Sequence, residues 1–255
     1  MKNKQLIIGV VLFLLGFVGV LSLLTMPFNV EAIPEEARED LLEQFSPDQL
    51  QLLNLINPTL ILLVCTFIGV KFSPKVNLEV PTLEKALEGG SWKNSLIGQV
   101  KSGFWGGVIG GVLIVLMYAL FRPLLPVNYL EIEEVSQPSV IARFLYGGIT
   151  EEIMMRYGVM TLVIWIISKF TKNLSQGVYW VGILIAAVLF GAGHLPMLSQ
   201  LVSEPTPVLV NFIIFANAAG GVVFGWLYWK KGLEAAIIAH MFAHVVLLIF
   251  NHISA

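Results

Sequence analysis

Six ionisable side chains lie inside stretches of sequence that are otherwise apolar. They are Glu151, Glu152, Arg156, His194, His240 and His244. A charged side chain at the centre of a bilayer costs about 2.5 to 3.5 kcal/mol on insertion scales, so each is a candidate for function. Carboxylates and imidazoles can move protons, bind a metal ion or stabilise a developing negative charge. The set therefore indicates hydrolysis, metal binding or proton transfer within a membrane.

The two adjacent acids are predicted to differ in their pairing. Glu152 and Arg156 are four residues apart, so a helix places them on one face, where they can form an ion pair. Glu151 lies about 100° around an α-helix from Glu152 and about 140° from Arg156. We therefore predict that Glu151 is the less neutralised carboxylate. The alternative is a buried polar cluster that only fixes helix packing, but this leaves the second acid without a partner.

The histidines also follow a helical pattern. His240 and His244 are four residues apart, which puts both imidazoles on one helix face. The pattern differs from the zinc-protease helix, because Met241 stands where that motif has Glu. His194 lies between two glycines and Pro196, which lacks an N–H and so frees a backbone carbonyl. The structural alternatives are hydrogen-bonded core histidines and, for His194, a kinked helix end.

Composition places these residues in a membrane protein. The chain has 255 residues, of which 56% are apolar and 13% charged, whereas soluble domains are about 25% charged. The net charge of −2 and the lack of a basic block exclude a nucleic-acid partner, and the single Cys65 excludes a disulfide framework. We predict an all-α polytopic bundle of about seven transmembrane helices, near residues 6–28, 52–72, 102–125, 141–167, 178–199, 207–229 and 232–252.

Positive charge predicts the orientation of this bundle. Eleven lysines fall on the side of the membrane that holds the amino terminus. Three arginines fall on the opposite side, namely Arg38, Arg122 and Arg143. The positive-inside rule therefore predicts an amino terminus inside and a carboxyl terminus outside.

The connections and small residues predict further local structure. Ser46 followed by Pro47 is typical of a helix start after an acidic segment, and residues 82–87 form an amphipathic stretch. Small residues at helical spacing predict close helix packing rather than chemistry; they are Gly103, Gly106, Gly107, Gly110, Gly111, Gly221 and Gly225. We expect a single membrane domain, with amino-terminal helices in residues 1–140 and a catalytic core in residues 141–252.

Three motifs in order resemble those of the CPBP (Abi) family of type II CAAX prenyl endopeptidases and their bacterial relatives. The motifs are Glu151-Glu152-x-x-x-Arg156, Phe190-x-x-x-His194 and His240-x-x-x-His244. The Gly221-x-x-x-Gly225 stretch before Ala239 also resembles the lead-in to the family's last motif. The resemblance covers residues 141–248 and implies an intramembrane endopeptidase in a bacterial cell membrane.

The resemblance also implies roles for these residues. Glu151 and His194 would activate the hydrolytic water, His240 and His244 would stabilise the oxyanion, and Glu152 with Arg156 would support the site. The family usually has Asn or another polar residue at the last position, whereas His244 can also ligate metal or change charge near neutral pH. We favour a metal-free reaction without a cofactor; the alternative is a zinc ion held by His194, His240, His244 and Glu151.

Several partners and functions follow from this interpretation. The expected partners are the lipid bilayer and a peptide or membrane-protein substrate, with or without a lipid anchor. The competing functions are a bacteriocin-immunity scaffold without catalysis and a proton-coupled transporter. A transporter usually shows two inverted halves, and no internal repeat is seen in the sequence.

Overall fold

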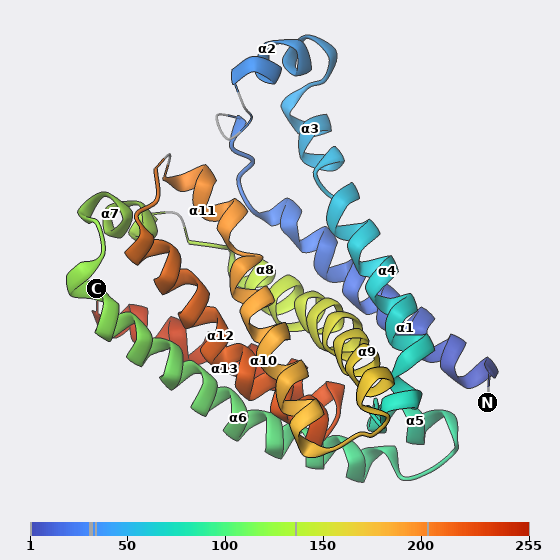
Figure 1. Cartoon of the computed structure of the whole chain (residues 1–255). Coiled ribbons are helices and arrows are strands. Elements are labelled where there is room, and N and C mark those ends of the chain that lie inside the picture. Colours follow the sequence, from blue (N-terminus) through green and yellow to red (C-terminus); the bar gives the residue numbers. More distant parts are fainter. Residues whose placement is uncertain (1, 31–32, 34, 136, 203, 255) are drawn as a thin grey trace.

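The structure is a computed structural model that describes residues 2–30, 33, 35–135, 137–202 and 204–254 (Figure 1). Its helices are α1 (Lys2–Ser22), α2 (Glu35–Gln44), α3 (Pro47–Leu53), α4 (Ile56–Phe72), α5 (Pro81–Leu87), α6 (Trp92–Phe121), α7 (Val127–Val135), α8 (Val140–Ala142), η5 (Arg143–Glu151), η6 (Ile153–Met160), α9 (Thr161–Thr171), α10 (Gln176–Ala192), α11 (Leu195–Leu201), α12 (Pro207–Lys230) and α13 (Leu233–Ser254). Short 3₁₀ turns η1 (Leu23–Thr25), η3 (Ser73–Val76) and η4 (Arg122–Leu124) follow α1, α4 and α6.

The predicted all-α bundle is confirmed. The described residues contain seven helical spans long and apolar enough to cross a membrane: Asn3–Thr25, Pro47–Val76, Trp92–Leu124, Val140–Thr171, Gln176–Ser199, Pro207–Lys230 and Leu233–Ser254. Several spans extend beyond the predicted apolar cores, because their helices continue into polar residues at the ends. The third span begins at Trp92, about ten residues before its apolar core.

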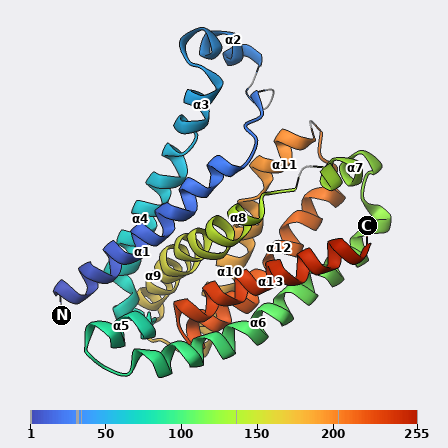
Figure 2. The same cartoon turned by 180° about the vertical axis from the view of Figure 1, so that it is seen from behind.

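Polar contacts hold the lysine-rich ends of several spans together. Lys4 Nζ lies 3.3 Å from Glu84 Oε2 and 2.7 Å from Glu88 Oε1, which joins α1 to the α5 segment. The Glu234 carboxylate accepts hydrogen bonds from the backbone N–H groups of Thr82 and Leu83, at 2.8 and 3.1 Å. The predicted amphipathic stretch is therefore a helix that connects the first and last spans at this end of the bundle (Figures 1 and 2).

The capped helix start after the acidic segment is also confirmed. The Ser46 side chain accepts from the Gln49 N–H, the Gln49 side chain accepts from the Ser46 N–H, and Pro47 is at the first position of α3. The acidic segment itself forms α2. Its helix lies beyond the ends of α1 and α4 (Figure 1).

The fourth span departs from regular α-helical geometry. Segments η5 and η6 are π-helical, with backbone hydrogen bonds from residue i to i+5 and a wider turn. Two threonine hydroxyls follow the same register: Thr150 donates to Leu145 O at 3.4 Å and Thr161 to Arg156 O at 3.2 Å. Runs of π-helix are rare and occur frequently at functional sites.

Glycines allow the other helices to approach closely, as predicted. A Cβ on Gly103, Gly107 or Gly111 would meet side chains or backbone of α13, and Figure 2 shows α6 and α13 side by side. Gly221 and Gly225 of α12 face Ala187 and Ile183 of α10. The fourth span lies at the centre of the bundle, in contact with α1, α4, α10 and α13.

Candidate active site

Glu152 is the centre of a buried charged cluster. It lies between η5 and η6, and its side chain is fully buried, as is that of Arg156. Glu152 Oε2 is 3.2 Å from Arg156 Nε, which confirms the predicted ion pair. Its other oxygen, Oε1, is hydrogen-bonded to His240 Nδ1 at 3.0 Å. No sequence pattern indicates this second contact, because it joins two different spans.

The neighbouring acid has a different environment. Glu151 is only partly buried, and within the described part of the chain it forms no hydrogen bond or ion pair. The angle of about 140° expected between Glu151 and Arg156 assumes an α-helix, whereas η6, which contains Arg156, is π-helical. The π-helical turn is wider, so a residue five positions on lies closer to the same face than it would in an α-helix. Only Glu152 nevertheless forms the ion pair.

Two phenylalanine rings enclose the charged cluster. The Arg156 guanidinium carbon lies 5.1 Å from the Phe190 ring centre and 5.9 Å from that of Phe224. Phe224 stacks on His240 with centroids 4.7 Å apart, and the edge-on Phe190 contacts both His194 and His240, at 4.9 and 5.8 Å. Phe190 is part of the second motif, whereas sequence reasoning missed Phe224. Cation–π contacts of this kind favour a desolvated guanidinium.

His194 lies at a break between two helices, as its glycine and proline neighbours predict. Helix α10 ends at Ala192, and His194 is the residue before α11. Its Nδ1 is 2.9 Å from Phe190 O. A backbone carbonyl can only accept, so Nδ1 carries the proton and, in the neutral ring, Nε2 is left as an acceptor. His194 is partly exposed, and this free nitrogen can therefore accept a proton or a hydrogen bond.

The His240 and His244 rings share one face of α13, as predicted. Their centroids are 4.9 Å apart and their planes differ by 22°. Both ring nitrogens of His244 are buried and have no hydrogen-bond partner among the described residues. A Cβ on Gly147 would lie 2.8 Å from His244 Nε2, so the missing side chain of Gly147 leaves room for this imidazole.

Arg143, counted among the arginines on the outer side, lies near the start of the fourth span. The residue begins η5 and is 9% exposed. Its guanidinium donates to Pro138 O at 3.1 Å and to Gln137 Oε1.

The donors proposed for zinc do not converge. No group of three or more His, Cys, Asp or Glu side chains in the described ranges is arranged to hold a metal ion. The near-parallel stacking of His240 on His244 explains part of this, since ring-nitrogen lone pairs lie in the ring planes and parallel planes do not aim them at one point. Metal-binding histidines often donate their second ring N–H to a carboxylate, as His240 does to Glu152. In their present positions, however, the proposed ligands do not fit zinc.

The structure thus brings His194, His240, His244, Glu152 and Arg156 into one connected group. Glu151 lies next to this group, without a direct bond to His194 among the described contacts.

A family model described as type II CAAX prenyl endopeptidase Rce1-like matches residues 135–246, which hold all six residues. No curated protein and no solved structure matches the chain. The seven spans and this match together indicate an integral membrane protein.

Proposed function

Because residues 135–246 match the model of the type II CAAX prenyl endopeptidase Rce1-like family, we propose that the chain is an intramembrane endopeptidase that uses a metal-free, glutamate-based mechanism. The substrate is a peptide or a membrane protein, with or without a lipid anchor. The observation that carries the mechanism is the difference between the adjacent acids. The Glu152 carboxylate pairs with Arg156 and accepts a hydrogen bond from His240, whereas Glu151 is partly exposed and forms no such bonds among the described residues.

Glu151 and His194 activate the water in this proposal. The Glu151 carboxylate accepts a proton as the water oxygen attacks the carbonyl carbon of the scissile bond. His194 Nε2 accepts the second hydrogen of the same water and orients it, since its Nδ1 is held by Phe190 O. The proton then passes to the leaving nitrogen as the C–N bond breaks, which yields a free amine and a carboxylate and returns the site to its starting state.

His240 is an oxyanion donor only if its Nε2 carries a proton. Pairing with Arg156 favours an ionised Glu152, so the His240–Glu152 bond takes its proton from Nδ1. A neutral His240 would then have no N–H on Nε2, whereas a protonated ring donates from both nitrogens. The oxyanion role of His240 in this proposal therefore requires a protonated ring, with the Glu152 carboxylate as its counter-charge.

His244 completes the oxyanion site. Its ring nitrogens have no partner within the described chain, so an N–H is available to the tetrahedral intermediate. Removing one oxyanion donor typically costs 10²- to 10³-fold in kcat. The zinc alternative has the same residues, but no step is assigned to a metal because the donors are not arranged around one point.

Cleavage assays on the purified protein in liposomes test this function. The substrates are internally quenched peptides with a farnesylated cysteine near the carboxyl terminus, and matched peptides without the lipid. We expect cleavage that is lost in Glu151→Gln. Cleavage of neither peptide, or equal cleavage by wild type and Glu151→Gln, contradicts the proposal and favours a scaffold or transporter.

A further inference from the structure

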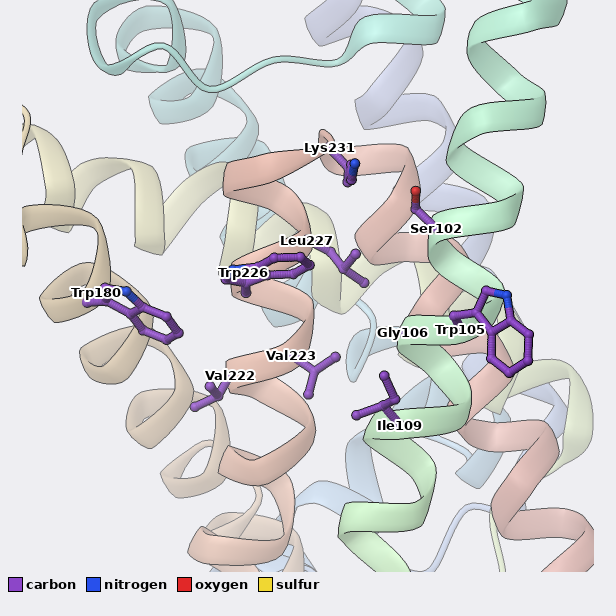
Figure 3. Close-up of a pocket in the computed structure, with 10 residues that line it drawn as sticks. All are labelled: Ser102, Trp105, Gly106, Ile109, Trp180, Val222, Val223, Trp226, Leu227 and Lys231. Carbon is purple, nitrogen blue, oxygen red and sulfur yellow. The ribbon is translucent and has the colours of Figure 1, made fainter. Parts of the chain in front are cut away.

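An apolar groove of about 480 Å³ lies between α6 and α12, near α10 (Figure 3). Trp105 and Ile109 of α6 line one side, and Val223 and Trp226 of α12 line the other, while Trp180 of α10 borders it. Another face of α12 carries Phe224, whose ring contacts Arg156 and His240. The groove is therefore on a different face of α12 from the candidate active site.

The groove faces the surroundings of the bundle. Trp105 is 59% exposed, Ile109 is 54% and Trp226 is 38%. In a membrane span these apolar side chains meet hydrocarbon rather than water. The body of the groove therefore suits an apolar chain.

One end of the groove is polar and positively charged. Lys231 and Ser102 lie there (Figure 3), and neither side chain has a hydrogen bond or ion pair with any residue that the structure describes. Gln99 Nε2 donates to Lys231 O at 2.9 Å, which holds the Lys231 backbone beside α6, one helical turn from Ser102. The exposed Lys101 and Lys230 add charge nearby, and Lys230 covers the Trp229 ring at 3.4 Å. Tryptophan and lysine at a span end are typical of the membrane interface.

The length of the groove indicates that it binds a lipid chain rather than a helix. Along α12 it runs from Lys231 to Val222, which is about nine residues or about 14 Å. Half of a hydrocarbon layer is about 15 Å thick, so the groove is one leaflet deep. A partner transmembrane helix would follow the whole span. An acyl chain of one leaflet, with an anionic headgroup at the lysine, matches both the depth and the charge.

We propose that this groove binds one anionic glycerophospholipid, with its phosphate on Lys231 and Ser102 and one acyl chain along Val223 and Trp226. The leaflet is the one on the lysine-rich side of the bundle. Anionic lipids of the cytoplasmic leaflet attract lysines at this position. The bound lipid also packs α6 against α12, and both helices contact α13, which carries His240 and His244.

Native mass spectrometry of the detergent-solubilised full chain tests the proposal with phosphatidylglycerol and phosphatidylcholine of identical acyl chains. Three variants are compared: Lys231→Gln removes the headgroup charge, Val223→Trp fills the groove, and Lys169→Gln is the matched control. Lys169 is also an exposed lysine beside a tryptophan, Trp165, but lies outside the groove.

We expect wild type and Lys169→Gln to retain one phosphatidylglycerol in preference to phosphatidylcholine. Lys231→Gln, which changes an exposed side chain, should weaken this binding about fivefold, the effect of one lysine at an anionic surface. Val223→Trp should abolish it. Equal retention of the two lipids, or no change in Lys231→Gln, overturns the proposal. A protein dimer that Val223→Trp dissociates, in place of a bound lipid, assigns the groove to a second copy and also overturns it.

Discussion

Glu152 Oε1 and His240 Nδ1 are 3.0 Å apart, although 88 residues separate them in the sequence. This bond joins the fourth span to the last and connects two of the three family motifs. Together with the Glu152–Arg156 ion pair, it makes Glu152 a positioning residue in the proposed mechanism. The same bond fixes the orientation of the His240 ring, because it fixes which nitrogen points away from Glu152.

Substitutions of the two adjacent acids should have different effects. Glu151→Gln should lower cleavage by at least about 10²-fold, since it removes the general base, while the thermal unfolding midpoint stays close to that of wild type. Glu152→Gln should instead destabilise the protein by about 3 to 5 kcal/mol, because Arg156 is left as a buried charge without its carboxylate.

These outcomes are measured by peptide cleavage and by thermal unfolding in the same detergent. Glutamine has nearly the same volume as glutamate, so neither substitution changes the packing volume and the two variants can be compared directly. If Glu151→Gln and Glu152→Gln lost stability and activity to the same extent, the assignment of separate roles to Glu151 and Glu152 would be wrong.

His244→Asn tests the metal-free mechanism. Asn keeps an N–H near the same place as the imidazole, so we expect the variant to retain much of the wild-type cleavage rate. The wild type should contain no stoichiometric zinc by elemental analysis. Stoichiometric zinc that disappears from the variant together with its activity would reverse this conclusion, since Asn is a poor zinc ligand.

Gly147→Ala should impair catalysis through His244. The added Cβ would lie 2.8 Å from His244 Nε2, which is too close for a normal contact, so the imidazole must move. We expect kcat to fall by about tenfold or more, with KM little changed, because a displaced oxyanion donor acts on the transition state. Gly98→Ala is the control, since no atom lies within 4 Å of its added Cβ. An unchanged kcat in Gly147→Ala would show that His244 is not a donor in its present position.

Gly107→Ala should destabilise the packing of α6 on α13. The new Cβ would meet the Ala239 backbone oxygen at 2.5 Å, and a backbone atom cannot rotate away as a side chain can. Overpacking of this kind costs about 1 to 3 kcal/mol, which thermal unfolding should detect. Gly98→Ala, on the same helix, should be neutral or slightly stabilising. Equal stability of the two variants would mean that α6 and α13 are not tightly packed at this point.

The sequence predicted the features that depend on composition and local spacing. Seven apolar runs identified the seven spans, and the separation of Glu152 and Arg156 identified their ion pair. The glycines of α6 were assigned to packing, and each of Gly103, Gly107 and Gly111 does face α13. The roles of Glu151 and the histidines, and the orientation in the membrane, stay predictions.

Features that depend on tertiary contacts could not be predicted in this way. The bond between Glu152 and His240 requires the fourth and seventh spans to be adjacent, which no local pattern encodes. The π-helical register of residues 153–160 changes the angle between Glu151 and Arg156, because spacing arguments assume 3.6 residues per turn. The burial of Arg143 likewise depends on its neighbours in the fold, which local spacing does not show.

The α5 helix has a consequence for biosynthesis. Its first N–H groups are bound by Glu234, at the start of the last span, and its acidic residues bind Lys4, at the start of the first. During translation α5 leaves the ribosome about 150 residues before Glu234 does, so the N–H groups of Thr82 and Leu83 lack their carboxylate partner until the seventh span is made. Ribosome-stalled chains that end before residue 234 should therefore expose α5 to protease, and chains that extend past the seventh span should protect it.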